Sequence, residues 1–331
     1  MSYDKYIYEK AEAELNQRRF INETENQYRI KEIEKKIPEI REINSRLTQT
    51  IVELSQLILK KEGNFESNLN KIKERNQQGQ RMAAELLISN GYPPDYLEER
   101  FDCSMCSDKG YVDGKRCECL TRLLNKYSIE ELNKSANMPE CDFEHFTLEY
   151  YRDKVIDNIN CFEIMAANYQ FCVEYAEAFT TDSGSLLLYG KTGVGKTHLS
   201  LSIAKAVAQK GYTVAYGSII NYLNIIEREH FSKTKDIFSP DTMNLLINTE
   251  LLVLDDLGSE FNTNFTESVI YNIINTRINL GLPTIINTNL DTDELQRKYN
   301  DRIISRIFCV YKTLYCLGVD IRQIKRLGNI N

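Results

Sequence analysis

The sequence predicts an α/β fold, with a parallel sheet between helices, preceded by an α-helical N-terminal region and a small four-cysteine hairpin. From residue 143 to residue 331, short apolar runs alternate with amphipathic stretches, a pattern typical of a parallel sheet covered on both faces. Residues 1–100 are charged and poor in glycine, which favours helices. Residues 101–120 contain two closely spaced pairs of cysteines. The predicted strands are residues 185–189, 213–217, 251–255 and 284–287.

Length and composition indicate how many domains to expect and which kinds of protein are excluded. A chain of 331 residues with 42% hydrophobic side chains is long enough for about two domains. The net charge of −7 gives no overall basic character for nucleic-acid binding, although a local basic patch remains compatible with it. No apolar stretch is long enough to span a bilayer, and the N-terminus lacks the apolar core of a signal peptide. We therefore expect a cytoplasmic protein without membrane contact, in which clustered cysteines indicate a metal site.

Residues 1–100 are predicted to form helices that dock a partner. Apolar residues recur there at alternating steps of three and four, and Asn44 takes the one polar a position of the heptad. Pro38 predicts a break, so one helix ends near Ile37, a second runs to about Lys61, and a third covers roughly residues 66–90. Two interpretations stay open: a helical hairpin that packs on itself, or a coiled-coil docking surface for a partner's helices. The apolar a positions are Ile30, Ile37, Ile51 and Ile58, and the d positions are Ile33, Ile40, Leu47 and Leu54.

The cysteines of residues 101–120 have the spacing of a zinc site. The pattern is C-x2-C, then C-x-C, formed by Cys103, Cys106, Cys117 and Cys119. Asp113-Gly114 between short extended runs predicts a type I′ hairpin, which brings the two pairs together as a tetrahedral zinc site requires. The alternative is four unligated thiols in a reducing compartment. Residues 121–142 follow as a helical linker to the α/β region, residues 143–331.

A glycine-rich loop in the α/β region fits the pattern G-x-x-x-x-G-K-[ST]. It lies between the first predicted strand and a helix. Backbone N–H groups of such a loop cradle phosphates, the lysine reaches the terminal phosphates, and the hydroxyl holds Mg²⁺. We therefore expect ATP with Mg²⁺ to bind and to be hydrolysed here. The predicted nucleotide-binding residues are Gly190, Lys191, Thr192, Gly193, Val194, Gly195, Lys196, Thr197 and His198.

The last two predicted strands end beside polar residues. Asp255 closes the third strand and is expected to hold Mg²⁺ together with Thr197, while the adjacent Asp256 polarises the attacking water. Glu260, four residues on, is an alternative for orienting the water. Asn289 follows the fourth strand and is either a contact to the γ-phosphate or an ordinary turn residue.

Ordered motifs across residues 138–328 lie in the phosphate loop and in residues 252–260, 274–277, 284–290, 301–307 and 318–322. Together they resemble the motifs of bacterial replicative helicase loaders of the DnaC/DnaI type, which are AAA+ ATPases. The cysteine segment similarly looks like the zinc-bearing N-terminal part of DnaI-like loaders. The resemblance implies that Asn289 is a sensor, that Arg306 is a finger reaching a neighbouring subunit's γ-phosphate, and that Arg322 is a second sensor in the lid over the nucleotide.

The resemblance further implies an ATP-dependent loader of the replicative DNA helicase onto single-stranded DNA. The N-terminal region would dock a DnaB-like hexameric helicase, and the ATPase domain would assemble into an open ring or spiral. Single-stranded DNA would bind partly through a helix inserted at about residues 219–241. The alternatives are a transposition helper ATPase of the IstB type and, from another class, a module that binds ATP without hydrolysing it. The candidate DNA contacts are Tyr222, Arg228, Phe231, Lys233 and Lys235.

Overall fold

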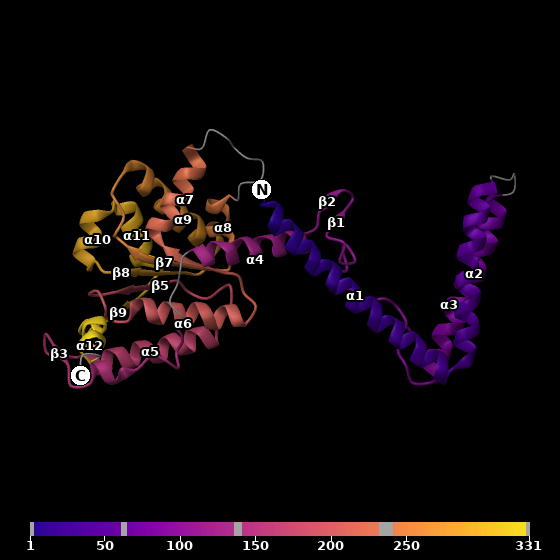
Figure 1. Ribbon diagram of the computed structural model, residues 1–331, viewed down its shortest axis with the longest axis horizontal. Helices are drawn as coiled ribbons and strands as arrows, with labels where there is room; N and C mark the ends of the chain where they lie inside the picture. Colours follow the sequence, from indigo (N-terminus) through magenta and orange to yellow (C-terminus); the bar gives the residue numbers. More distant parts are fainter. Residues whose placement is uncertain (1–2, 61–64, 136–140, 232–240, 329–331) are drawn as a thin grey trace. The chain divides into compact units, whose positions relative to one another are not determined.

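The computed structural model describes residues 3–60, 65–135, 141–231 and 241–328 (Figure 1). The chain divides into two compact units, one formed by Met1–Lys10 with Arg122–Asn331 and the other by Ala11–Thr121. The larger unit therefore begins earlier in the sequence than the predicted boundary at residue 143. Within the described ranges, no helix combines the length and the apolar character that crossing a bilayer requires.

Three helices account for most of the first 90 residues. They are α1 (Lys5–Lys36), α2 (Pro38–Lys60) and α3 (Phe65–Ser89). The break between α1 and α2 lies where Pro38 predicts it, because proline is tolerated in the first turn of a helix but not in its interior. The predicted end of the first helix and the predicted bounds of the other two agree with the structure to within about one residue.

The apolar stripe of these helices packs inside the smaller unit. A buried cluster joins the end of α1 and the start of α2 to the last turn of α3. Farther along, a side chain at Gly79 of α3 would lie only 3.3 Å from Leu47 of α2, so glycine permits the close approach of the two helices. This packing supports the hairpin interpretation for α2 and α3. The cluster is formed by Ile33, Ile37, Ile40 and Leu87.

The two-stranded hairpin predicted from Asp113-Gly114 is present. Strand β1 (Tyr111–Val112) pairs antiparallel with β2 (Lys115–Arg116). Asp113 and Gly114 have φ angles of 50° and 73°, the two positive values that define a type I′ turn. The hairpin therefore returns the chain from the first cysteine pair to the second.

The larger unit contains a five-stranded parallel sheet in the order β6-β7-β8-β5-β9. Four of its strands were predicted, whereas β9 was not. Only one of the four residues of β9 is buried, so this edge strand lacks the apolar run that marks the others. The strands are β5 (Leu186–Tyr189), β6 (Val214–Ser218), β7 (Leu251–Leu257), β8 (Thr284–Thr288) and β9 (Lys312–Tyr315).

Helices cover both faces of the sheet (Figure 1). Alternate residues of β5, β6, β7 and β8 enter two separate apolar clusters, as expected for strands buried on both sides. Helices α5 (Cys161–Glu177) and α6 (Lys196–Gln209) lie on one face. The other face carries α7 (Ile219–Phe231), α8 (Thr242–Asn248), α9 (Asn264–Leu280), α10 (Thr292–Lys298) and α11 (Asp301–Val310). Shorter elements of this unit are η1 (Leu148–Tyr151), β3 (Val155–Ile156), β4 (Ile159–Asn160) and α12 (Ile321–Gly328). The arrangement confirms the predicted fold class.

Helix α4 (Glu118–Ser135) is more than the linker that the sequence suggested for residues 121–142. Ile129 is 3% exposed and belongs to the apolar cluster on one face of the sheet. Asn133 forms two hydrogen bonds with the backbone of β6: its Nδ2 donates to the carbonyl of Val214 (2.6 Å), and its Oδ1 accepts from the N–H of Tyr216 (2.9 Å). The end of α4 is therefore part of the α/β unit.

Arg277 on α9 is fully buried, and its hydrogen-bond partners in the described part of the chain are neutral oxygen atoms. Its guanidinium donates to the hydroxyl of Thr284 and to four backbone carbonyls between 2.6 and 3.0 Å away. Because burial of a cation is costly, the group is stable only while these acceptors surround it, and burial lowers its pKa to about 10. Arg277 thus holds the C-terminal end of α8 against the start of β8. The carbonyls belong to Leu246, Ile247, Thr249 and Pro283.

Candidate functional site

The phosphate loop joins β5 to α6, and its glycines occupy positions that other residues would not fit. Gly190, Gly193 and Gly195 have φ angles of 140°, 79° and 95°. A Cβ atom would lie 2.1 Å from the carbonyl oxygen of Cys316 at Gly190, and 2.0 Å from a carboxylate oxygen of Asp320 at Gly193. Both the backbone conformation and the surrounding contacts therefore require glycine, as a loop folded closely around phosphate does.

Lys196 lies at the start of α6 with its ammonium group held inside the loop. Its Nζ donates to the carbonyls of Gly190 (2.7 Å) and Lys191 (2.8 Å) and to Oδ1 of Asn289 (2.8 Å). The residue is 4% exposed, and burial lowers the pKa of the ammonium. The contacts place a cation where a phosphate oxygen would enter the loop.

Asp255, at the end of β7, accepts hydrogen bonds from three elements. The donors are the Thr197 hydroxyl (3.1 Å), the side-chain amide of Asn287 (2.7 Å) and the Tyr216 hydroxyl (3.2 Å). Burial raises the pKa of this carboxyl despite these donors. A hydroxyl and a carboxylate in contact fit Mg²⁺, which prefers oxygen ligands. Asn287 and Tyr216 were not predicted, since a polar residue within an apolar strand gives no local sign of what it contacts.

Asp256 and Glu260 have different environments. Asp256 has a positive φ of 55°, lines the cavity beside the phosphate loop, and accepts a hydrogen bond from Nδ2 of Asn289 (3.0 Å). Glu260 is 6% exposed, and its carboxylate accepts from the Tyr299 hydroxyl (2.5 Å) and from the N–H of Gly258 (2.9 Å). Only the first of these two acids therefore faces the cavity, and the geometry favours it for contact with water.

The cavity measures about 290 Å³ and continues past the phosphate loop to an aromatic wall. Phe146 stacks on Tyr151 and packs edge-on against the imidazole of His198. The Tyr151 hydroxyl donates to the carbonyl of Val194 in the loop (3.0 Å). A flat apolar surface next to a phosphate site suits a nucleobase. This wall was not predicted, although the aromatic residues clustered between residues 143 and 151 are visible in the sequence.

The two arginines taken from the resemblance lie in different places. Arg322, on α12, lines the cavity. Arg306, on α11, is absent from the cavity lining and instead donates to Oδ1 of Asn275 (2.7 Å) and packs over the ring of Tyr271. A role for Arg306 in this site therefore requires a second copy of the chain.

The predicted DNA-binding insert is only partly confirmed as an exposed surface. Phe231 is 64% exposed and Arg228 is exposed, both near the end of α7. Tyr222 is 1% exposed and packs beside Gly217, so its selection as a stacking residue was wrong: an aromatic ring on the inner face of an amphipathic helix joins the core. Lys233 and Lys235 lie outside the described residues.

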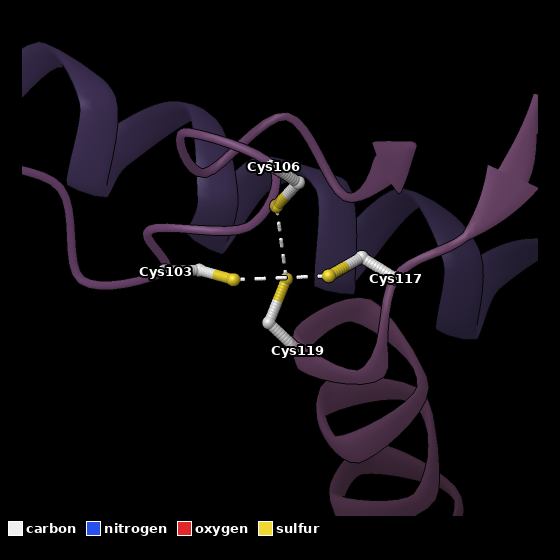
Figure 2. A group of neighbouring side chains, drawn as sticks. All are labelled: Cys103, Cys106, Cys117 and Cys119. Atoms are coloured by element: carbon white, nitrogen blue, oxygen red, sulfur yellow. Dashed lines mark hydrogen bonds between the residues drawn. The ribbon is translucent and has the colours of Figure 1, made fainter. Parts of the chain in front are cut away.

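The four predicted zinc ligands meet in the smaller unit (Figure 2). Their Sγ atoms all lie within 4.8 Å of one another, with Cys103 and Cys117 3.7 Å apart and Cys106 and Cys119 3.3 Å apart. Four sulfurs around a tetrahedral zinc ion are separated by about 3.8 Å, given a Zn–S bond of roughly 2.3 Å. The sulfurs point toward a common centre, so the donor set and spacing fit a structural zinc ion.

Local contacts hold the cysteines in this arrangement. Asp108 is fully buried, and its carboxylate accepts from the backbone N–H groups of Asp102 and Cys103 (both 2.9 Å). Backbone N–H groups lower the pKa of Cys103 to about 7, whereas burial raises the pKa of Cys106 and Cys119. Four thiolates this close would repel one another, so full deprotonation requires a cation among them.

The larger unit is similar in sequence to proteins that are already known. Residues 162–309 match the family of IstB-like ATP binding proteins. The chain is 27% identical over 226 residues to the replicative helicase loader DnaI of Bacillus subtilis, covering 62% of this chain and 70% of that protein. It is 24% identical over 188 residues to the replicative helicase loader DnaC of Buchnera aphidicola subsp. Baizongia pistaciae, covering 57% of this chain and 69% of that protein.

A solved structure is also similar. The crystal structure of the DnaC helicase loader aligns with a TM-score of 0.44 at 23% identity, covering 53% of this chain and 98% of that one. The phosphate loop and the acidic end of β7 both lie within the stretch matched by the family. Residues 162–309 therefore form an ATP-binding domain that is similar to the IstB-like ATP binding proteins and to the DnaI and DnaC loaders.

Proposed function

We propose that this protein is an ATP-dependent loader of the replicative DNA helicase onto single-stranded DNA. The observation that carries the proposal is the site in which Lys196, Thr197, Asp255, Asp256 and Asn289 converge, within a domain whose relatives are named replicative helicase loaders. The free thiols fit a reducing compartment such as the cytoplasm. ATP binding and hydrolysis would switch the assembly that the loader forms.

The placement of these groups supports hydrolysis as part of the proposed function. The loop N–H groups and Lys196 bind the phosphates, and Asp256 accepts a proton from the attacking water on the same side of the cavity. Asn289 lies between Lys196 and Asp256 and orients both. Mg²⁺, held through Thr197 and Asp255, would neutralise charge on the phosphate oxygens.

The site is proposed to be completed by a second copy of the chain. Arg322 contacts the phosphates from within the same subunit, while Arg306 reaches the nucleotide of its neighbour. A planar cation on a transferring phosphoryl group stabilises the charge spread over its oxygens. The contact is head-to-tail, which generates an open ring or spiral rather than a closed dimer.

The smaller unit is proposed to dock the helicase. Its α2–α3 hairpin carries exposed apolar residues, Val52 and Met82 among them, that a partner's helices would cover. Zinc at the four cysteines would fold a segment too small to have a core of its own. Single-stranded DNA is proposed to contact the α7 region, where Arg228 and Phe231 are exposed.

The direct test uses the full chain and the hexameric replicative helicase of the same host or phage. Native mass spectrometry is expected to show a helicase–loader complex. The complex is then expected to displace an oligonucleotide annealed to circular DNA that is otherwise single-stranded and coated with single-strand-binding protein. Displacement should require both the loader and ATP. Removal of the α2–α3 hairpin should abolish the helicase–loader complex without abolishing ATP binding.

A transposition helper of the IstB type would give the opposite pattern. It would form no complex with the helicase, yet its ATPase would respond to DNA and to a transposase. A module that binds ATP as a structural ligand would show no turnover in any of these mixtures.

A further inference from the structure

Strand β6 forms one edge of the sheet, and its outer side is occupied by a side chain. In a parallel sheet, one residue of a neighbouring strand donates its N–H to the carbonyl of residue i and accepts from the N–H of residue i+2. The amide of Asn133 does the same with the carbonyl of Val214 (2.6 Å) and the N–H of Tyr216 (2.9 Å). Asn133 therefore stands in for one residue of an additional strand and fixes the backbone of Tyr216.

Tyr216 connects this edge to the nucleotide site. Its ring is 4% exposed, within the apolar cluster that also contains Val253 of β7. Its hydroxyl donates to Oδ2 of Asp255 at 3.2 Å, because residues 216 and 255 lie diagonally across the β6–β7 pair and point to the same face. A tyrosine ring is rigid, so the position of its hydroxyl follows the position of its backbone.

We infer that Asn133 and Tyr216 are positioning residues for Asp255, which aim the carboxylate of the magnesium site from the edge of the sheet. The inference rests on the proposed function in so far as that site binds Mg²⁺ with a nucleotide. Asn133 precedes the segment that matches the ATP-binding family, so it is a feature of this chain that the family match does not include. Asp255 retains the Asn287 and Thr197 donors, so the loss of Tyr216 would reorient the carboxylate rather than leave it unpaired.

The test measures metal binding rather than turnover. Mn²⁺ replaces Mg²⁺, and its affinity for the full chain saturated with a hydrolysis-resistant ATP analogue is read by electron paramagnetic resonance. Tyr216→Phe keeps the ring and removes only the donor, and is expected to weaken Mn²⁺ binding about three- to tenfold, the loss of one hydrogen bond. Asn133→Ala is expected to weaken it by a similar or smaller factor.

The double variant Asn133→Ala/Tyr216→Phe shows whether Asn133 affects Mn²⁺ binding through Tyr216 or independently of it. If Asn133 acts through the tyrosine hydroxyl, the double variant should bind Mn²⁺ no more weakly than Tyr216→Phe alone. Analogue affinity in the presence of a chelator should stay unchanged in all variants. Asn224→Ala, at an exposed position of α7, is the matched control.

The outcomes are distinct. Unchanged Mn²⁺ affinity in Tyr216→Phe, or additive losses in the double variant, would overturn the inference. Should Asn133→Ala fold poorly, Tyr216→Phe still decides whether the hydroxyl positions Asp255. A wild-type chain that binds Mn²⁺ and analogue, shows the expected losses in the variants and yet hydrolyses no ATP would overturn the proposed function and leave this inference intact.

Discussion

The side-chain amide nitrogen of Asn289 lies 3.0 Å from a carboxylate oxygen of Asp256, while its oxygen lies 2.8 Å from the ammonium of Lys196. One amide thus connects the cation that meets the phosphates with the acid proposed to activate water. The amide has one donor end and one acceptor end, so an ionised carboxylate of the same length, which only accepts, would not reproduce both contacts.

Asn289→Ala is therefore expected to lower kcat for ATP hydrolysis by about 10²-fold while changing nucleotide affinity little, since the phosphates are held mainly by the loop. Steady-state ATPase assays and binding of a fluorescent ATP analogue measure the two quantities. A normal kcat would show that the contact is only structural.

Asp256 and Glu260 make a matched pair for assigning the group that activates water. Asp256→Asn should reduce kcat by roughly 10²- to 10⁴-fold, because the amide accepts no proton. Asparagine also tolerates the positive φ at this position, so the fold should be retained. Glu260→Gln should leave kcat unchanged but destabilise the fold by about 1–3 kcal/mol, because it disturbs the buried contacts to Tyr299 and Gly258. The reverse result, with activity lost only in Glu260→Gln, would reassign the role.

The raised pKa of Asp255 predicts a pH-dependent cost to stability in the absence of metal. For a carboxyl whose pKa is higher in the folded than in the unfolded chain, the stabilising contribution is complete below the unfolded pKa and is lost as the pH rises through the folded pKa. At neutral pH with a chelator, Asp255→Asn should therefore melt about 2–4 °C above the wild type.

Two further measurements check the assignment to Asp255. The difference in Tm should shrink as the pH is lowered toward the unfolded pKa of aspartate. Added Mg²⁺ and ATP should raise the Tm of the wild type more than that of the variant, because only the wild type retains the carboxylate ligand. A variant that melts below the wild type under chelation would contradict the prediction.

Arg277→Met tests the buried guanidinium. The substitution leaves four carbonyls without their donor in the protein interior, and we expect a loss of roughly 3–5 kcal/mol in the free energy of unfolding. Urea denaturation followed by circular dichroism measures it. Arg297→Met, on an exposed face of α10, is the control and should change stability by about 0.5 kcal/mol or less.

The cysteine cluster predicts one zinc ion per chain. Native mass spectrometry of the full chain should show this stoichiometry, and Cys106→Ser should abolish it. Cys309→Ser provides the matched control, because Cys309 is exposed and distant in sequence from the cluster. A wild-type chain purified with added zinc but carrying no metal would rule out the site.

The buried strands and the phosphate loop were predictable because their signals are local. Continuous apolar runs mark β5, β7 and β8, and the loop and the Asp113-Gly114 turn depend on glycine at fixed positions. Strand β9 gave no such signal, since an edge strand with three exposed residues resembles a loop.

The contacts that complete the site depend on residues distant in the sequence, which no local pattern reveals. Asn133 and Tyr216 are 83 positions apart, and Asn289 and Lys196 are 93 apart. Tyr222 was wrongly predicted to stack on bases, because that prediction used the residue type alone. The helical face on which it lies places it in the core. The sequence therefore predicted which groups are available, and the fold decided which of them meet.

The amide of Asn133 also limits how copies of this protein can associate. An open sheet edge is a template on which another chain can add a strand, and such pairing leads to uncontrolled aggregation as readily as to ordered assembly. At Val214 and Tyr216 the required donor and acceptor are already satisfied within the chain. Backbone pairing is thus blocked at the centre of the β6 edge, and subunits that meet there must recognise one another through their side chains.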